Sequence, residues 1–188
     1  MKHNWLLLKF FLFLFPLLFI SSCNKIVHKN SQMIFDFENP NNLNSLVWQC
    51  KVDYKWNMLH ATQGLYCLEV DFYPSSQSEF KSSAFKDLFH DWRGFRWLCL
   101  DIFSPSSNQI RLFYCIDDHS HNFPWIDKAN GSILLHHGIN HVKIYLLKLK
   151  SPGSQKKLDL SYIASIGFFL KNPKKKVVLF FDNIHLTR

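Results

Sequence analysis

The sequence predicts an all-β domain, a two-sheet antiparallel β-sandwich of jelly-roll type, preceded by a lipoprotein signal peptide. Eight short runs alternate apolar and polar residues, and clusters of turn residues separate them. Only one stretch, Ser83–His90 (SAFKDLFH), has a short helical pattern. Aromatic residues make up 16% of the chain, with 19 Phe. Many short strands without long helices between them are typical of sandwiches.

The predicted strands follow one another along the chain between turn signals. They are residues 33–38, 46–54, 65–73, 95–103, 110–117, 141–147, 163–170 and 177–186. Asn, Pro and Ser close several of them, as in Asn39–Asn42 (NPNN) and Pro74–Ser76 (PSS). Asn172–Lys174 (NPK) is predicted to join the last two strands as a hairpin.

Alternation within the strands assigns side chains to two faces. Leu98, Leu100 and Ile102 form an apolar row that we expect to face the other sheet, whereas Trp97 falls in the outward row with acids and cysteines. Trp92 precedes this strand in a loop-like DWRG sequence. We therefore expect Trp92 to plug the end of the sandwich and Trp97 to be available to a ligand.

The first residues indicate export and lipid attachment. The apolar run Phe10–Ile20 has 11 residues, which is too short to span a bilayer as a helix, and Lys2 and Lys9 give a positive start. Ile20–Cys23 (ISSC) resembles the lipobox of bacterial lipoproteins. The resemblance implies cleavage before Cys23 and acylation of its thiol. The alternative is an ordinary signal peptide or an uncleaved anchor.

These features predict the organisation and location of the chain. We expect residues 1–22 to be the signal peptide, 23–32 a lipidated cysteine with a polar tether, and 33–188 one domain. The lipoprotein resemblance implies a lipid anchor in the membrane of a bacterial cell envelope. Asn24 follows the cysteine where Asp would signal retention at the inner membrane, so the resemblance implies the outer membrane where a cell has two.

The basic residues do not predict a nucleic-acid partner. Without the leader, Lys and Arg fall from 22 to 20 against 14 Asp and Glu, a formal net charge of +6. The lysines gather in short clusters, Lys156–Lys157 and Lys174–Lys176, and not along one apparent face. Nucleic-acid binding needs a groove or a motif as well as charge. We interpret the clusters as solvated turns that also favour an anionic surface or polymer.

Several stretches resemble one known family in both sequence and order. They are IFDFE (34–38), HATQGLYCLEVDF (60–72), DWRGFRWLCLDIFSP (91–105), LHHGINHVKIYLLKL (135–149), LDLSYIASIGFFL (158–170) and VVLFFDNIHL (177–186). Together they resemble the galactose-binding-like jelly-roll domains, which include many carbohydrate-binding modules. The resemblance covers about residues 34–186 and implies the sandwich fold more strongly than any particular ligand, because fold does not carry function with it.

A polysaccharide or other glycan is the ligand that the residues and the resemblance together favour. Sugars present apolar C–H faces and rings of hydroxyls, which suit an aromatic outer face with polar side chains beside it. The alternative for each ring is packing in the core or in a loop. The candidate ligand-binding residues are Trp48, Tyr54, Trp56, Trp97, Arg111, Tyr114, Asp118 and Trp125.

The resemblance also implies a structural calcium ion. Many members of the family hold one between the first strand, a glycine loop and the last strand. The matching positions here are Asp36, Glu38 and Asp182, with backbone carbonyls near Gln63 and Gly64. Carboxylate and carbonyl oxygens suit a hard cation. The alternative is that the acids are outward strand residues, or that Asp182 pairs with a lysine.

Two other functions stay open beside glycan binding. An envelope protein-interaction or assembly lipoprotein is the second class, since jelly rolls of this kind also bind proteins. Enzymatic motifs such as Gly-x-Ser-x-Gly or His-Glu-x-x-His are missing from the sequence, so we expect a non-catalytic protein. A jelly-roll polysaccharide lyase that uses Tyr114, Arg111 and His119 is the weaker alternative.

The remaining cysteines and histidines do not decide the function. Cys50, Cys67, Cys99 and Cys115 allow three disulfide connectivities in an exported protein, or are free thiols. The loop sequence CIDDHSHNFPW (115–125) offers Asp and His ligands for a transition metal. A loop does not fix their geometry, so we interpret them as a polar rim.

Overall fold

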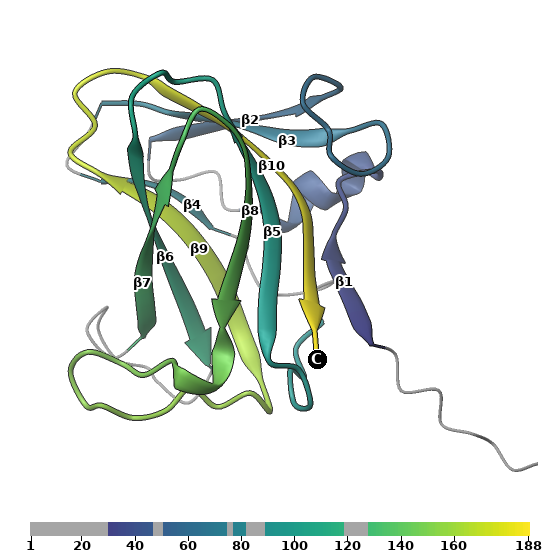
Figure 1. Cartoon of the computed structure of the whole chain (residues 1–188), viewed down its shortest axis with the longest axis vertical. Helices are drawn as coiled ribbons and strands as arrows, with labels where there is room; N and C mark the ends of the chain where they lie inside the picture. Colours follow the sequence, from purple (N-terminus) through teal and green to yellow (C-terminus); the bar gives the residue numbers. More distant parts are fainter. Residues whose placement is uncertain (1–29, 47–50, 75–76, 82–88, 119–127) are drawn as a thin grey trace, which may run out of the picture.

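The computed structural model describes residues 30–46, 51–74, 77–81, 89–118 and 128–188. Two antiparallel sheets form a sandwich, which confirms the predicted fold class (Figure 1). The strands are β1 (Ser31–Phe35), β2 (Val52–Asn57), β3 (Cys67–Phe72), β4 (Gln77–Lys81), β5 (Trp97–Ser104), β6 (Ile110–Asp118), β7 (Ala129–Leu135), β8 (Gly138–Tyr145), β9 (Ile163–Lys171) and β10 (Val177–Thr187). Short 3₁₀ helices are η1 (Pro40–Ser45) and η3 (Leu146–Lys148). Among the described residues, no helix is long and apolar enough to cross a membrane.

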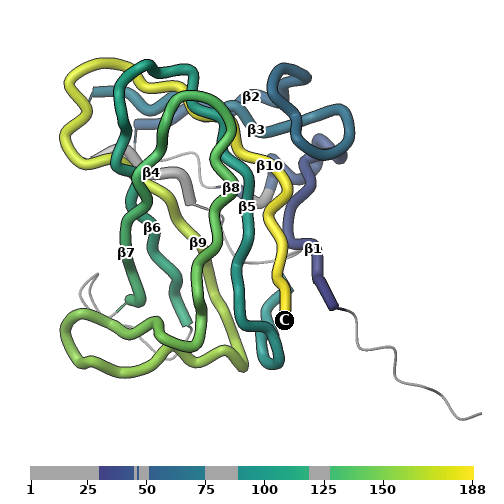
Figure 2. The backbone as a smooth tube through the Cα atoms, viewed as in Figure 1, coloured from purple at the N-terminus to yellow at the C-terminus, as the bar shows by residue number. Residues whose placement is uncertain are grey.

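Strand β10 is the centre of the six-stranded sheet, whose path is β2-β3-β10-β5-β8. Along one edge, the first half of β10 pairs with β3 and the second half with β1, while β5 pairs along the other edge. A bulge between Asp182 and His185 interrupts the pairing with β5, and Asn183 within it has a φ of 52°. The second sheet has the order β4-β9-β6-β7 (Figure 2).

The core lies between the two sheets, on the faces that the alternation assigns to it. Leu98, Leu100 and Ile102 of β5 are buried and belong to one apolar cluster. Residues of the four-stranded sheet, such as Leu112 and Phe168, belong to the same cluster. The predicted inward row of β5 is confirmed.

The hairpin predicted at Asn172–Lys174 is wrong. β9 belongs to the four-stranded sheet and β10 to the six-stranded sheet, so this turn carries the chain from one sheet to the other. Turn chemistry specifies that the chain reverses, but not which strand the next segment pairs with. The pairing of β10 depends on β3 and β5, which are distant in sequence.

Two strands were not predicted. β4 reads QSEFK and β7 reads ANGSILL, and neither has the regular alternation of the other strands. β4 pairs with β9, and β7 pairs with β6, so their neighbours specify them rather than their own patterns. Most of the predicted helical stretch 83–90 lies outside the described residues, and Phe89 and His90 are not helical.

Trp92 packs inside the sandwich, as predicted. Its side chain is fully buried, and its indole Nε1 donates a hydrogen bond to the Phe89 carbonyl oxygen at 2.6 Å. Its backbone N–H donates to the Leu160 carbonyl oxygen at 2.8 Å. The backbone of Trp92 therefore joins the segment before β5 to the segment before β9.

We expect Trp92→Ala to lower the free energy of unfolding by about 3–5 kcal/mol, because truncating a buried aromatic side chain leaves a cavity. Trp97→Ala should lower it by no more than about 1 kcal/mol, since Trp97 is partly exposed. Urea unfolding of both variants measures the difference. The reverse order of stability would refute the assignment of the two indoles.

Candidate functional site

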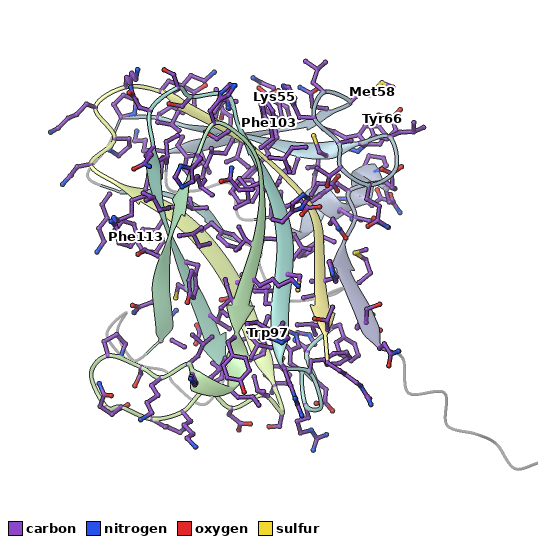
Figure 3. All side chains as sticks on the ribbon, in the orientation of Figure 1. Lys55, Met58, Tyr66, Trp97, Phe103 and Phe113 are labelled. Carbon is purple, nitrogen blue, oxygen red and sulfur yellow. The ribbon has the colours of Figure 1, made fainter. Side chains whose placement is uncertain are left out.

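A groove runs over the outer face of the six-stranded sheet, and we call it the Trp97 groove. Its cavity of about 350 Å³ is lined by Cys99, Leu100, Asp101, His141, Val142, Lys143, Asn183, His185 and Thr187. Trp97 and Tyr145 lie next to it at one end, because Trp97 pairs with Thr187 of β10 and with Tyr145 of β8. Figure 3 shows Trp97 near the end of β5 where the chain enters the strand.

Cross-strand pairing places polar and aromatic side chains of β5 and β8 on this face. Asp101 lies opposite His141, Cys99 opposite Lys143, and Trp97 opposite Tyr145. The residues between them on β8, Val142 and Ile144, are buried against the core. The groove therefore has an aromatic end and a polar end.

The aromatic end consists of two partly exposed rings. The ring centroids of Trp97 and Tyr145 are 4.7 Å apart, with the planes tilted by 52°. The ammonium of Lys148 lies 5.9 Å from the centre of the Tyr145 ring. Partly exposed aromatic rings beside polar groups are able to contact the apolar face of a ligand.

The polar end depends on Asp101. Its Oδ1 lies 2.6 Å from Nδ1 of His141, and its Oδ2 accepts hydrogen bonds from the Thr62 hydroxyl at 2.8 Å and the Asn183 amide at 3.1 Å. Burial opposes ionisation of Asp101, but the hydrogen bonds from His141, Asn183 and Thr62 outweigh it and lower the pKa of the carboxyl. His141 is 74% exposed, so its ring is accessible to a ligand.

Residues 58–66, between β2 and β3, form a loop that two carboxylates hold against the sheet. Oδ2 of Asp182 accepts hydrogen bonds from the backbone N–H groups of Thr62 at 2.6 Å and Gln63 at 2.9 Å. Oε1 of Glu38 accepts from the N–H groups of Leu65 at 2.9 Å and Tyr66 at 2.8 Å. Burial raises the pKa of Asp182, although the backbone hydrogen bonds oppose the shift.

This hydrogen bonding does not fit one calcium ion shared by Asp36, Glu38 and Asp182. N–H groups repel a cation, and they already occupy an oxygen of Glu38 and one of Asp182, while Asp36 accepts from the Glu38 N–H at 3.2 Å. Among the described residues, no group of three His, Cys, Asp or Glu side chains is arranged to hold a metal ion. The ion stays a prediction, and a melting temperature raised by calcium relative to chelator would support it.

The same loop carries three exposed apolar side chains, which together we call the aliphatic patch. Met58, Leu59 and Leu65 are 61%, 63% and 62% exposed. Trp56 stacks on Tyr66 at the base of the loop, with ring centroids 3.7 Å apart, and its Nε1 donates to the Phe37 carbonyl oxygen. Trp56 thus belongs to this loop region and does not line the Trp97 groove, as the positions of Tyr66 and Trp97 in Figure 3 indicate.

Three other predicted ligand residues are in structural positions. Tyr54 and Tyr114 are 5% and 9% exposed and belong to the core, so the prediction that they offer rings to a ligand is wrong. Asp118 is buried, and its Oδ2 accepts the N–H of Asp159 at 2.6 Å. Tyr54 shares the inward parity of Val52, and Tyr114 that of Ile116.

The other predicted residues are separate from the groove or undescribed. Arg111 is exposed on the outer face of the four-stranded sheet and donates to the Ser132 hydroxyl at 3.3 Å. Because Arg111 and Tyr114 lie on opposite faces of β6, the lyase site that unites them is wrong. Trp48, Trp125, His119 and the lipidation candidate Cys23 lie outside the described residues.

The described cysteines form no disulfide with one another. Cys67, Cys99 and Cys115 are buried and unbonded to one another, and Cys50 lies outside the described residues. Burial raises the pKa of the Cys67 thiol to about 12, and its Sγ donates to the Leu59 carbonyl oxygen at 2.9 Å. A thiol with so high a pKa is a poor nucleophile, so Cys67 has a packing role.

Sequence reasoning missed most of the groove. Asp101, His141, Lys143, Tyr145 and His185 were not among the candidates. The alternating sequence His-Val-Lys-Ile-Tyr (141–145) is the signal that could have placed three of them on one outward face. The pairing of this strand with β5 was needed to bring them beside Trp97.

Comparison with known proteins finds similarity in the fold alone. Neither a family model nor a curated protein matches the sequence. A family 11 carbohydrate-binding module from Clostridium thermocellum, solved with a β-1,3-1,4-mixed-linked tetrasaccharide, has a TM-score of 0.61 at 23% identity and covers 84% of this chain and 95% of its own. The chain shares its fold with these binding modules. A family 30 module from the same organism gives a TM-score of 0.54 at 14% identity, covering 84% of this chain and 96% of its own.

An enzyme contains the same fold as one part. An exo-beta-agarase gives a TM-score of 0.64 at 17% identity, covering 83% of this chain. The match spans only 25% of the agarase chain. The similarity is therefore to a portion of that enzyme.

We expect Gly64→Ala to be more destabilising than Gly138→Ala. Both glycines have a positive φ, of 70° and 89°, so both substitutions introduce backbone strain. A Cβ at position 64 would also collide with the Glu38 carboxylate, whereas nothing lies within 4 Å of one at position 138. Thermal unfolding of the two variants compares them, and equal melting temperatures would contradict the role of Glu38 in holding the loop.

Acid should weaken the attachment of the loop at Asp101. Because its pKa in the folded protein is below the unfolded value of about 3.9, the carboxylate contributes stability that is present above about pH 4 and lost as the pH falls further. Asp101→Asn should lower the free energy of unfolding at pH 7. It should also make that free energy fall less between pH 7 and pH 3. Urea unfolding at pH 7 and pH 3 measures both, and an unchanged decline would contradict the prediction.

Proposed function

We propose that this domain is a non-catalytic carbohydrate-binding module and that the Trp97 groove binds the glycan. The observation that carries the proposal is the partly exposed Trp97–Tyr145 pair at the end of a cavity of about 350 Å³ whose lining includes Asp101 and His141. The fold shared with family 11 modules, one of which was solved with a bound tetrasaccharide, supports it.

The two ends of the groove suit the two surfaces of a sugar. Trp97 and Tyr145 offer apolar faces on which the C–H face of a pyranose packs. Asp101 is an ionised acceptor at neutral pH, and Lys143 is an exposed donor beside it. Charge-assisted hydrogen bonds of this kind hold hydroxyl groups in a fixed orientation.

We propose binding without catalysis because the chain matches whole binding modules but only a part of an enzyme. The modules of families 11 and 30 are matched over at least 95% of their own length. The agarase is matched over a quarter of its chain. A domain that corresponds to whole binding modules and to a minor part of an enzyme is best assigned the role of the former.

We also propose that Cys23 anchors the domain by lipid to the bacterial cell envelope. Strand β1 begins at Ser31, eight residues after Cys23, so the tether is short. The start of β1 and the C-terminus lie at the same end of the sandwich (Figure 1). Incorporation of labelled palmitate, lost in Cys23→Ala, tests the anchor.

Binding should depend on the two rings. Against a panel of immobilised polysaccharides, the wild-type chain should be retained on at least one glycan. Trp97→Ala and Tyr145→Ala should each weaken that binding at least about fivefold, given stacking energies of roughly 1–3 kcal/mol per ring. Arg111→Ala is the matched control, because it removes an exposed side chain from the other sheet. Isothermal titration with oligosaccharides of the retained glycan measures the affinities. Loss with Arg111→Ala and not with Trp97→Ala would place the site on the four-stranded sheet.

The aliphatic patch favours a second candidate function, an envelope protein-interaction module. Met58, Leu59 and Leu65 are exposed on a loop that Glu38 and Asp182 hold rigidly, and an ordered apolar surface of this kind is typical of protein contacts.

Photo-crosslinking from position 59 in cells tests this second function. A defined adduct would be expected, and Met58→Ser with Leu65→Ser should abolish it. The same double variant should leave glycan binding unchanged. No adduct from position 59 would count against this function.

A further inference from the structure

A second cavity lies at the end of the sandwich away from Trp97, and we call it the lysine pocket. Its volume is about 540 Å³. One wall is Pro105–Ile110, which is the connection from β5 to β6 with the first residue of β6. The other is Lys174–Val178, the turn before β10 and the start of that strand. It shares no lining residue with the Trp97 groove.

Positive charge is concentrated on one wall of the lysine pocket. Lys174, Lys175 and Lys176 are consecutive in the lining, and none of the lining residues is acidic. Among the residues that the structure describes, Lys174 and Lys175 are exposed and make no ion pair. Two ammonium groups are therefore available to a ligand.

Lys176 fixes this wall in place. Its Nζ lies 2.7 Å from Oδ2 of the buried Asp71, which also accepts from Lys55 at 2.8 Å, and it lies 5.5 Å from the centre of the Tyr73 ring. Burial opposes ionisation of Asp71, but hydrogen bonds from Lys176 and Lys55 outweigh it and lower the pKa of the carboxyl. The lysine run is thus tied to β3 through a charged hydrogen bond, and it continues directly into β10.

The opposite wall supplies small polar groups. Ser106, Ser107, Asn108 and Gln109 line it. The turn is ordered by its own contacts, since the Ser106 hydroxyl accepts the Asn108 N–H at 3.1 Å and donates to the Asn108 carbonyl oxygen at 3.0 Å. The Gln109 amide contacts His136 at 3.3 Å, so the donors of this wall that suit an anion are the Ser107 hydroxyl and the Asn108 side-chain amide. Together with ammonium groups on the other wall, such donors bind the oxygens of an anion.

We propose that the lysine pocket binds an anionic group, a sulfate ester or a carboxylate, on an acidic polysaccharide. This inference rests on the proposed function and names the class of glycan. The Trp97 groove and the lysine pocket lie toward opposite ends of β5, an eight-residue strand that spans on the order of 25 Å. Phe103, labelled in Figure 3 at the far end of β5 from Trp97, marks the side on which the pocket lies. A ligand that contacts both must be a polymer.

The test compares polymers that differ in charge. The probes are neutral dextran, dextran sulfate, polygalacturonate and inorganic sulfate, and the variant is Lys174→Gln with Lys175→Gln. Lys156→Gln with Lys157→Gln is the matched control, because it removes the same charge from another exposed turn. Urea unfolding confirms that both variants stay folded.

We expect the wild-type chain to bind at least one of the two acidic polymers, and the Lys174/Lys175 variant to bind it at least about tenfold more weakly at low salt. The dependence of log Kd on log salt concentration should become shallower by about one to two in the same variant. The control variant should change neither quantity by more than twofold. Preference for dextran sulfate indicates a sulfate ester, and preference for polygalacturonate indicates a carboxylate.

The following results would overturn the inference. An equal loss in the control variant would assign the binding to net charge, and an unchanged affinity in the Lys174/Lys175 variant would exclude the pocket. Inorganic sulfate bound as tightly as dextran sulfate would show a site for a small anion and not for a polymer. Glycan binding that needs Trp97 but not these lysines would leave the proposed function intact while refuting the pocket, and the opposite pattern would refute the groove alone.

Discussion

The pairing of β10 along both of its edges is the constraint on which the rest of the structure depends. Its 11 residues join the first strand, β3 and β5 in one sheet, so contacts between distant parts of the chain stabilise it together. The bulge at Asp182–Asn183 interrupts this pairing where the 58–66 loop reaches the sheet. The strand that organises the core therefore also positions the carboxylate that holds the loop.

Buried carboxylates connect the fold to its outer surface. Asp182 and Asp101 lie opposite each other on β10 and β5, and both contact Thr62 of the loop. Asp101 also contacts His141 in the Trp97 groove, so one hydrogen-bond network holds the loop and orients the polar end of the groove. Asp71 holds Lys176 in the wall of the lysine pocket at the other end of the sheet. Each proposed binding surface thus lies beside an acid that is largely removed from water.

The sandwich carries three candidate binding surfaces, which differ in chemistry. The Trp97 groove combines rings with hydrogen-bonding groups, the lysine pocket combines ammonium groups with hydroxyls and amides, and the aliphatic patch is apolar. The first two suit different portions of one charged polymer, because a groove for sugar rings does not by itself select for charge. The patch projects from a loop that contributes nothing to the lining of either cavity.

The sequence by itself determined the fold class and the inward rows of the central strands, because period-two alternation and turn residues are local signals. Leu98, Leu100 and Ile102 follow directly from it, and so does the packing of Trp92. It placed Asp71, Cys99 and Asp101 in the outward row, and the structure buries them as well. The tertiary structure decided which outward residues meet. Alternation along the strand gives Tyr114 the inward parity of Ile116. Tyr114 was named a ligand-binding candidate only because its ring suits a sugar. Asp101 and His141 are 40 positions apart and become neighbours only through strand pairing. Pro105 and Lys174 line one cavity only because the fold brings their two segments together. Pairing over such separations depends on the packing of whole sheets, which no local pattern encodes.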